Sequence, residues 1–511
     1  MDFITASSPS IVIITALAAL LTLYAVKISV QCLFSKKRYH PIAGTIFNQL
    51  LNFHRLHHYM TDLAKKNQTY RLLSPFRSEV YTADPVNVEY ILKTNFPNYG
   101  KGWHNYSILS DLLGDGIFTV DGEKWRHQRK VSSHEFSTKV LRDFSSSVFR
   151  RNAAKVAGMI SELAISNSSM DIQDLFMKAT MDSIFKVGFG IELDTMGGSS
   201  EGTRFANAFD DSSAMTLWRY VDILWTIKRR LNVGFEATLK KNIKVIDDFM
   251  YKLIRNKIEQ VSKSKEDPDL SETKKEDIMS RFLDLNETDP RYLRDIILNF
   301  LVAGRDTTAT TLSWFIYMLS KNFKIQEKIA KEVREMAKPK DENTSFVDFA
   351  AYLTEDVLDK MQYLHAALSE TLRLFPAVAV DAKICFGDDT LPDGYSVKKG
   401  DMVTYMPYAM GRIKSIWGED AEEFRPERWI NEDGNFRGET ASKFTAFQAG
   451  PRICLGKEFA YRQMKIFSAM LLGCFSFALT DETKPVKYRT MLNLHIDNGL
   501  QVRAFHRYES K

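Results

Sequence analysis

Ten residues near the end of this 511-residue chain, FQAGPRICLG at Phe447–Gly456, constrain its fold more than any other feature. They place Cys454 in a loop between glycines, which let backbone amides approach the sulfur closely. Apolar residues at helical spacing after Gly456 predict a helix, whose N-terminal dipole favours a thiolate. A protected thiolate is a good iron ligand, so Cys454 is the best candidate for one. The alternative, an ordinary buried cysteine, is disfavoured by the loop around it.

A second feature is the long apolar segment Leu293–Leu319, which the polar run AGRDTT at Ala303–Thr308 interrupts. As one helix the segment would be about 40 Å long, the breadth of a domain. A glycine in mid-helix costs about 1 kcal/mol relative to alanine, and hydroxyl groups there can draw the backbone out of its hydrogen-bond ladder. The interruption therefore predicts a function at mid-helix, rather than a helix with incidental polar residues.

Two short pairs accompany these features. Glu370 and Arg373, in LHAALSETLRLFP, share one helix face, and Pro376 predicts the end of that helix. Trp125 and Arg129, in GEKWRHQRK, also share a helix face, so an indole N–H and a guanidinium can point at one anion. Each pair alone is typical of a solvated helix surface.

Together the segments, with FRPERW at Phe424–Trp429, resemble the cytochrome P-450 superfamily of haem-thiolate monooxygenases. The resemblance implies a mainly α fold with a small β region, that is, an α-helical haem domain with minor antiparallel sheets. Short strand-like segments at 69–71, 79–81, 402–405 and 501–504 agree with it. It also implies an oxidoreductase that uses haem b, O2 and electrons from NADPH, with the Cys454 thiolate as the axial ligand of the haem iron.

The resemblance assigns roles to further residues. Thr307 would hydrogen-bond iron-bound oxygen, and Asp306 would belong to the proton relay, which makes them the catalytic pair. The residues expected to bind haem propionates are Trp125, Arg129, Arg452 and, on a looser match, Lys383. The residues expected to form a buried network bracing the Cys454 loop are Glu370, Arg373 and Arg428. Animal fatty-acid ω-hydroxylases carry a haem-esterified glutamate where this chain has Ile296, so we predict haem that is non-covalent apart from the thiolate–iron bond.

Three stretches indicate the substrate: FPNYGKG at 96–102, VDAKICFGDDTLPDGYSV at 380–397 and YAMGRIKSIWGEDAEEFRPERW at 408–429. They resemble the plant clan of long-chain fatty-acid hydroxylases, which often act at the ω carbon. A monooxygenase of terpenoids or other specialised metabolites remains open. An O2-independent fatty-acid hydroperoxide isomerase or dehydratase is disfavoured by Asp306 and Thr307, and a non-catalytic haem- or lipid-binding protein is the last alternative. Apolar candidates for the pocket wall are Ile108, Leu113, Phe118, Phe300, Ala303, Val378 and Val380.

The motifs must surround one cofactor, so we expect one haem-thiolate monooxygenase domain at residues 46–511 rather than several domains. Before it we predict a transmembrane anchor at 9–34 and a basic linker or hinge at 35–45. A cleavable signal peptide is disfavoured, because positive charge follows the apolar run instead of preceding it. The positive-inside rule leaves the domain in the cytosol, and the resemblance implies the endoplasmic reticulum membrane with a single pass. The four cysteines show no disulfide-like spacing, which fits a reducing compartment.

A net charge of +5 indicates no nucleic-acid partner. Basic residues gather in the motifs nearest the thiolate, and they suit an acidic electron donor. These residues are Lys124, Arg126, Arg129, Lys130, Arg452 and Lys457. The chain has no NAD or flavin fingerprint, so electrons must come from a partner. The resemblance names a membrane-bound NADPH–cytochrome P-450 reductase, with cytochrome b5 as a possible second donor. Two charged stretches, 262–277 and 338–345, are predicted to be surface loops.

Overall fold

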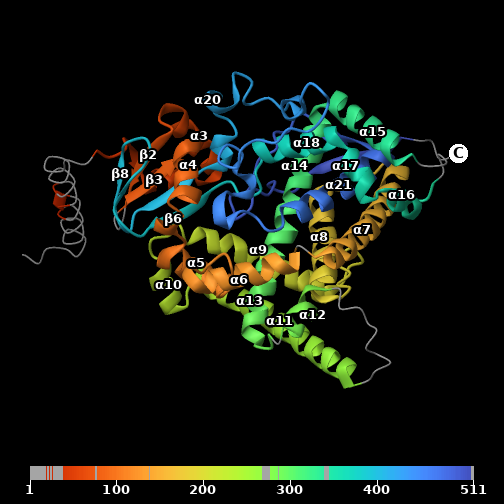
Figure 1. Ribbon diagram of the computed structural model, residues 1–511, viewed down its shortest axis with the longest axis horizontal. Helices are drawn as coiled ribbons and strands as arrows, with labels where there is room; N and C mark the ends of the chain where they lie inside the picture. Colours follow the sequence, from red (N-terminus) through yellow and green to blue (C-terminus); the bar gives the residue numbers. More distant parts are fainter. Residues whose placement is uncertain are drawn as a thin grey trace, which may run out of the picture.

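Helices make up most of the protein, and the strands of the largest sheet gather at one side (Figure 1). The computed structural model describes residues 38–74, 78–136, 138–266, 277–285, 287–338 and 344–507, with residues 19, 22, 23 and 26. The predicted anchor and the first part of the predicted linker lie outside the continuously described ranges. In those ranges no helix has the length and apolar character needed to cross a bilayer.

The helices begin and end as follows in chain order: α2 Ile46–Leu51, α3 Leu56–Lys66, α4 Pro85–Glu89, α5 Gly102–Leu113, α6 Gly122–Phe136, α7 Lys139–Ile165, α8 Ile172–Phe189, α9 Ser200–Trp218, α10 Trp225–Leu231, α11 Phe235–Glu266, α12 Ile278–Asp284, α13 Pro290–Leu301, α14 Thr307–Lys321, α15 Phe323–Ala337, α16 Phe346–Tyr352, α17 Glu355–Lys360, α18 Gln362–Leu374, α19 Pro407–Met410, α20 Lys414–Trp417 and α21 Lys457–Cys474. The strands are β1 Ile42–Thr45, β2 Thr69–Leu73, β3 Ser78–Thr82, β4 Tyr99–Gly100, β5 Met170–Asp171, β6 Asp381–Cys385, β7 Asp389–Thr390, β8 Ser396–Val397, β9 Met402–Tyr405, β10 Phe475–Leu479 and β11 Gln501–His506.

The strands form three sheets, of which the largest has the order β1-β2-β3-β9-β6-β4. The four strands expected from the sequence are confirmed within β2, β3, β9 and β11. The prediction of antiparallel sheets is wrong for two pairs, because β1–β2 and β3–β9 are parallel. A parallel pair needs a long crossover, and helices supply it here: α2 and α3 lie between β1 and β2. The other sheets, β10-β11-β5 and β7-β8, are antiparallel.

Two apolar cores hold these layers together. The larger core packs the side chains of the helices, including α7, α8, α13, α14, α18 and α21. The smaller core lies beneath the large sheet and α3. Between the helices, α13 and α14 form a central rod through the molecule (Figure 1). The rod confirms the long helix predicted at Leu293–Leu319.

The rod contains the predicted interruption. Val302–Asp306 form a π-helical turn between α13 and α14. Gly304 lets this turn approach α8 closely, because a Cβ at this position would lie 2.7 Å from Cδ1 of Ile184 and that side chain would have to move. The Thr307 hydroxyl donates to the carbonyl oxygen of Ala303 at 2.5 Å. The local polar residues therefore do what the pattern predicted, since they take part of the backbone out of the α-helical ladder.

One loop prediction is wrong in part. Helix α11 continues to Glu266, so 262–266 are helical rather than a loop. Lysine and glutamate are good helix formers, and their charge gave a misleading indication of disorder. The rest of that stretch, 267–276, lies outside the described residues. In the second predicted loop, Lys338 ends α15 with φ +45° and Ser345 caps α16, while 339–343 are not described.

Candidate active site

The Cys454 loop is fixed on both sides. The Cys454 amide donates to the carbonyl of Phe447 at 2.8 Å, and the Gly456 amide hydrogen-bonds the Cys454 sulfur. Gly450 has φ +65°, and a Cβ on it would lie 2.0 Å from the carbonyl oxygen of Leu92. Only glycine allows that contact, so the loop packs directly on the Tyr90–Thr94 turn. The predicted helix after the loop is α21.

The Cys454 side chain is surrounded by protein and yet open. Burial raises the pKa of its thiol, whereas the Gly456 amide and the charges of Arg129 and Lys457 lower it. Its surface is nevertheless exposed, as is that of the neighbouring Ile453. A thiol that is desolvated but uncovered faces a space inside the protein, which is what an iron ligand requires.

The indole and guanidinium groups near this space lack acceptors. Trp125 is buried on α6, and within the described ranges neither its N–H nor the Arg129 guanidinium has a hydrogen-bond partner. Arg129 lies close enough to Cys454 for each charge to stabilise the other. Free cationic and N–H donors beside an uncovered thiol fit haem, which offers an iron for the sulfur and two propionates for the donors.

Arg452 lies over the ring of Trp125, with Cζ 4.5 Å from the ring centroid. Its Nη2 donates to the Asp121 carboxylate at 2.7 Å and to the Val120 carbonyl at 2.9 Å. Its Nε is buried without an acceptor in the part of the chain that the structure describes. Arg452 therefore ties the Cys454 loop to the segment before α6 and keeps one N–H available.

Lys383 is buried on β6, and its ammonium is 2.6 Å from the Asp381 carboxylate. Asp381 also binds Lys101 at 2.8 Å and accepts from the Tyr405 hydroxyl at 3.0 Å. Burial lowers the pKa of Lys383 to about 7, and the positive charges of Lys101 and Arg452 add to this effect while Asp381 opposes it. The structure thus places Lys383 near Arg452, but the Lys383 ammonium is paired with Asp381.

At the π-helical turn, Asp306 and Thr307 are adjacent but make different contacts. The Asp306 carboxylate is buried, accepts from Arg305 at 2.9 Å and accepts from the Asn493 amide at 3.3 Å. Burial raises the pKa of Asp306 to about 6, although the Arg305 charge opposes the rise. Thr307 is only partly buried, and its hydroxyl binds Ala303 as described above. Asp306 is therefore held ready to exchange a proton near neutral pH.

Sequence reasoning missed the groups that hold Asp306. Arg305 is buried and forms an ion pair with Asp210 on α9 as well as with Asp306. Asn493 and His495 reach the same place from the loop before β11. The available signal was Arg305 itself, because a buried arginine needs a counter-charge. No local spacing links residues about a hundred or more positions apart, so the sequence could not show which residues are the partners.

Glu370, Arg373 and Arg428 come together as expected. Arg373 donates to both oxygens of Glu370, and Arg428 Nε lies 3.5 Å from one of them. The sequence did not indicate Trp429, whose indole N–H donates to Glu370 at 2.9 Å.

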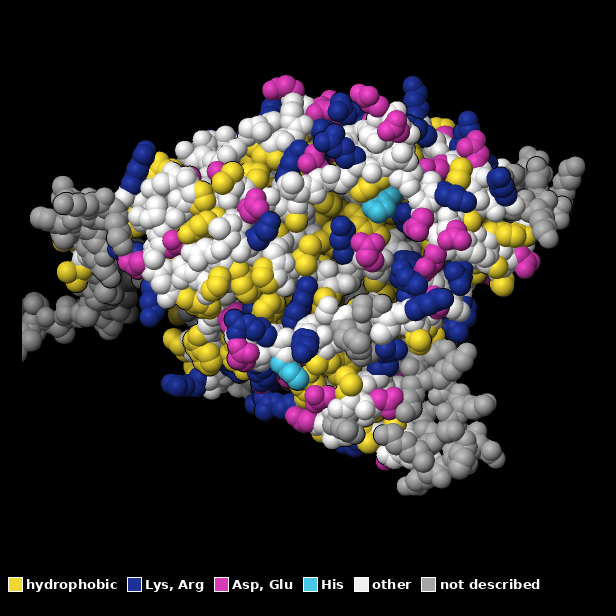
Figure 2. Space-filling view, viewed as in Figure 1, with side chains coloured by type: hydrophobic (Ala, Val, Ile, Leu, Met, Phe, Trp, Pro, Cys, Tyr) yellow, Lys and Arg dark blue, Asp and Glu magenta, His cyan; other side chains and the backbone are white. Residues whose placement is uncertain are grey.

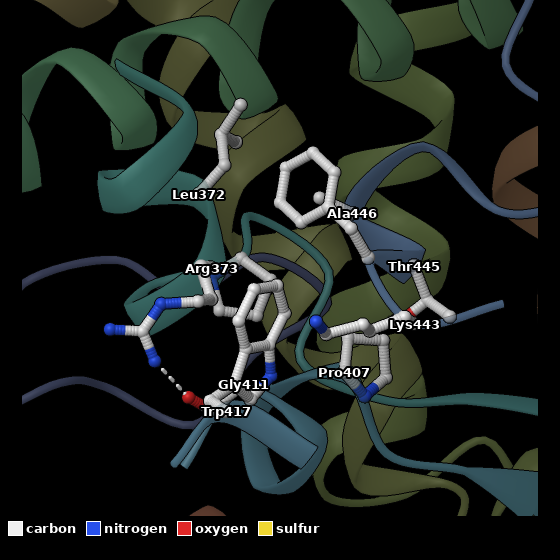
Figure 3. Close-up of a pocket in the computed structure, with 10 residues that line it drawn as sticks. Leu372, Arg373, Pro407, Gly411, Trp417, Lys443, Thr445 and Ala446 are labelled. Carbon is white, nitrogen blue, oxygen red and sulfur yellow. Dashed lines mark hydrogen bonds between the residues drawn. The ribbon is translucent and has the colours of Figure 1, made fainter. Parts of the chain in front are cut away.

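Figure 3 shows the cleft beside this network, where Arg373 reaches the Gly411 carbonyl next to the Trp417 ring. The cleft is lined by Leu372, Arg373, Pro376, Pro407, Gly411, Trp417, Lys443, Phe444, Thr445 and Ala446.

The apolar pocket candidates differ in burial. Ile108 and Leu113 are buried in the larger core. Phe118, Phe300, Ala303 and Val380 are partly buried, and Phe300 packs against Phe136 at a centroid distance of 5.2 Å. Val378 is 38% exposed. The five residues that keep exposed surface are better candidates for a pocket wall than Ile108 and Leu113.

Comparison with known proteins finds one family throughout. The family model described as Cytochrome P450 matches residues 35–501. The chain is 50% identical to cytochrome P450 704C1 of Pinus taeda over 92% of this chain and 93% of that protein. It is 45% identical to cytochrome P450 704B1 of Arabidopsis thaliana over 90% and 93% of the two chains. With cytochrome P450 94A2 of Vicia sativa it shares 39% identity over 85% and 84%.

Proposed function

The chain belongs to the cytochrome P450 family of monooxygenases, and from that premise we propose that it hydroxylates a long-chain fatty acid. The family uses haem-thiolate iron with O2 and NADPH-derived electrons, so haem is the cofactor of this enzyme. One observation carries the assignment of the centre: the Cys454 thiol is desolvated, hydrogen-bonded by Gly456 and still uncovered. The fatty-acid substrate is supported by the three stretches that resemble plant fatty-acid hydroxylases.

Bound haem supplies the site where O2 is reduced and one oxygen atom enters a C–H bond. Cys454 would ligate the iron through its sulfur, and the Gly456 amide would keep that sulfur a thiolate. Trp125, Arg129 and the free N–H of Arg452 would bind the propionates. Lys383 would not bind a propionate directly, because its ammonium is paired with Asp381, and it would contribute only its positive charge.

Asp306 and Thr307 would move protons on the oxygen side. A carboxyl with a pKa near 6 can both accept and release a proton at neutral pH. The Thr307 hydroxyl donates to Ala303, so its oxygen keeps lone pairs that can accept a hydrogen bond. Glu370, Arg373 and Arg428 would keep the Cys454 loop in place from behind.

Enzymes of this family work with a redox partner. We infer that the donor here is NADPH–cytochrome P-450 reductase, with cytochrome b5 as a second donor. Figure 2 shows Lys and Arg side chains spread over the face in view, with Asp and Glu among them. In the predicted basic cluster, Lys124 is paired with Asp115, Arg126 with Glu123 and Arg452 with Asp121. The other three members, Arg129, Lys130 and Lys457, have no ion pair in the described ranges. We also infer that the domain faces the cytosol from the endoplasmic reticulum membrane.

The decisive experiment is a titration of the full-length, haem-loaded protein with long-chain fatty acids. We expect the haem absorption band to shift toward high-spin iron, and hydroxylated product to form with NADPH, reductase and O2. Terpenoids of similar size serve as the comparison series. A thiolate-type spectrum that responds to terpenoids and to no fatty acid would show that the proposed substrate class is wrong.

A further inference from the structure

Arg305 lies between two carboxylates of very different exposure. It is 2% exposed, and the face of Phe209 on α9 lies 5.9 Å from its Cζ. Both Nη atoms contact Asp210, with Nη2 3.1 Å from Oδ2, and Nη1 also donates to Asp306 at 2.9 Å. The Asp210 side chain is 36% exposed, whereas that of Asp306 is 1% exposed. One guanidinium therefore joins a buried acid to a carboxylate that reaches water.

The contact crosses from one element to another. Arg305 and Asp306 belong to the π-helical turn of the central rod, whereas Asp210 belongs to α9, which passes beside that rod (Figure 1). Arg305 Nη1 is shared between the two carboxylates, so a stronger contact with one weakens the contact with the other. The position and charge of Asp210 thus decide how strongly Arg305 binds Asp306.

The loop before β11 supplies the remaining polar groups near this ion pair. Asn493 donates to the second oxygen of Asp306. His495 is buried near Asp210, Arg305 and Arg489, and its Nε2 has no partner among the described residues. Burial lowers the pKa of His495 to about 4, so it is neutral at pH 7. Asp210 and Arg305 are therefore the charged groups that act most directly on Asp306.

We propose that Asp210 is a positioning residue for Asp306: it holds the outer side of the Arg305 guanidinium and so keeps Arg305 from neutralising the acid completely. The inference rests on the proton-relay role proposed for Asp306. Without the Asp210 charge, Arg305 turns fully to Asp306 and stabilises its carboxylate form. Asp306 then carries a proton less often at neutral pH, and proton delivery slows.

The test is Asp210→Asn in the full-length enzyme with reductase, using any substrate that gives product. We expect kcat to fall about tenfold, since relayed protons contribute at least that much, while KM stays within about twofold. Peroxide formed per NADPH should rise, and the descending limb of the pH profile should move to lower pH. Asp210→Glu should restore the profile. Because any productive substrate serves, a wrong substrate class leaves this test intact.

The matched control is Asp211→Asn, which removes the same charge from the next residue of α9. Asp211 is exposed and has no ion pair among the residues that the structure describes, so all four readouts should stay at their wild-type values. An unchanged pH profile and peroxide yield in Asp210→Asn, with normal haem content, would overturn the proposal.

A second comparison covers the case in which Asp210→Asn does not fold. Asp210→Asn/Arg305→Gln removes both charges and leaves no unpaired arginine. If Asp210 acts through Arg305, this double variant and Arg305→Gln should differ by less than about twofold in peroxide yield and in the pH dependence of thermal unfolding. A larger difference between these two variants would contradict the proposal, whether or not Asp210→Asn folds.

Discussion

Arg373 donates from Nε and Nη2 to the two oxygens of Glu370, at 2.7 and 2.8 Å, and neither side chain is exposed to solvent. The remaining donors of Arg373 bind the carbonyls of Gly411, Ala421 and Glu423. A surface pair at this helical spacing contributes little, but a fully buried pair with every donor used is costly to break. The pair therefore links α18 to the segment 411–429.

Arg373→Lys keeps the charge but loses the bidentate geometry and most of the carbonyl contacts. We expect the free energy of unfolding to fall by about 1–3 kcal/mol, because buried acceptors lose their donors, measured by urea denaturation. The exposed pair Lys331–Glu335 provides the control, because Lys331→Ala should cost less than about 0.5 kcal/mol. Equal costs at the two sites would contradict this account of the network.

Cys454→Ala should remove thiolate-ligated haem while leaving the helical fold, because the surface of the side chain is exposed and its truncation removes little packing. Absorption spectra of the purified protein and far-ultraviolet circular dichroism measure the two properties. Cys474→Ala is the matched control, since Cys474 is the other partly exposed cysteine in the described ranges. An unaltered haem spectrum in Cys454→Ala would refute the assignment of the ligand.

Thr307→Ala removes the hydroxyl at the π-helical turn. We expect NADPH consumption to continue while product falls and peroxide rises, because the hydroxyl that positions the transferred proton is lost. A loss of about tenfold or more in product per NADPH is the expected size. Thr311→Ala removes the same kind of hydroxyl one turn later and should leave coupling unchanged. Unchanged coupling in Thr307→Ala would count against the relay role of Thr307.

The raised pKa of Asp306 predicts how stability depends on pH. The folded protein holds this proton up to about pH 6, whereas the unfolded chain releases it near pH 4. The group therefore favours the folded state below about pH 4, and that contribution, about 3 kcal/mol, is lost as pH rises to about 6. Thermal unfolding of Asp306→Asn should lack this loss. A wild-type-minus-variant difference that stays flat between pH 4 and 6 would show that the pKa is not raised.

Haem should leave the denatured protein. Ile296 is buried on α13 and carries no carboxyl group that could form an ester with haem. Acid–butanone extraction should therefore move all haem into the organic phase, measured by the absorbance of both phases. Ile296→Glu tests whether the missing carboxyl group is the reason, because only that variant should retain haem on the protein. Haem retained by the wild-type protein would show that haem is bound covalently through a residue other than Ile296.

Much of the site could be predicted from the sequence because its groups are encoded locally. Cys454 and its glycines lie in one loop, Glu370 and Arg373 lie one turn apart, and the polar run at 303–308 interrupts one helix. In each case the spacing along the chain defines the geometry. Strands β2, β3, β9 and β11 were found for the same reason, whereas the other strands were not predicted. The parallel pairing of β3 with β9 was missed, since it joins segments more than 300 residues apart.

The sequence by itself determined the candidate ligand thiol, the helix that follows it and the family of the enzyme. Only the tertiary structure decided which charges pair: Arg305 with Asp210, and Lys383 with Asp381 rather than with a free anion. The physical reason is that a buried charge must find a partner, but packing alone selects that partner from all the carboxylates of a long chain. Local sequence patterns predict the chemical groups of the site, and the packing of the core decides which charged groups become neighbours.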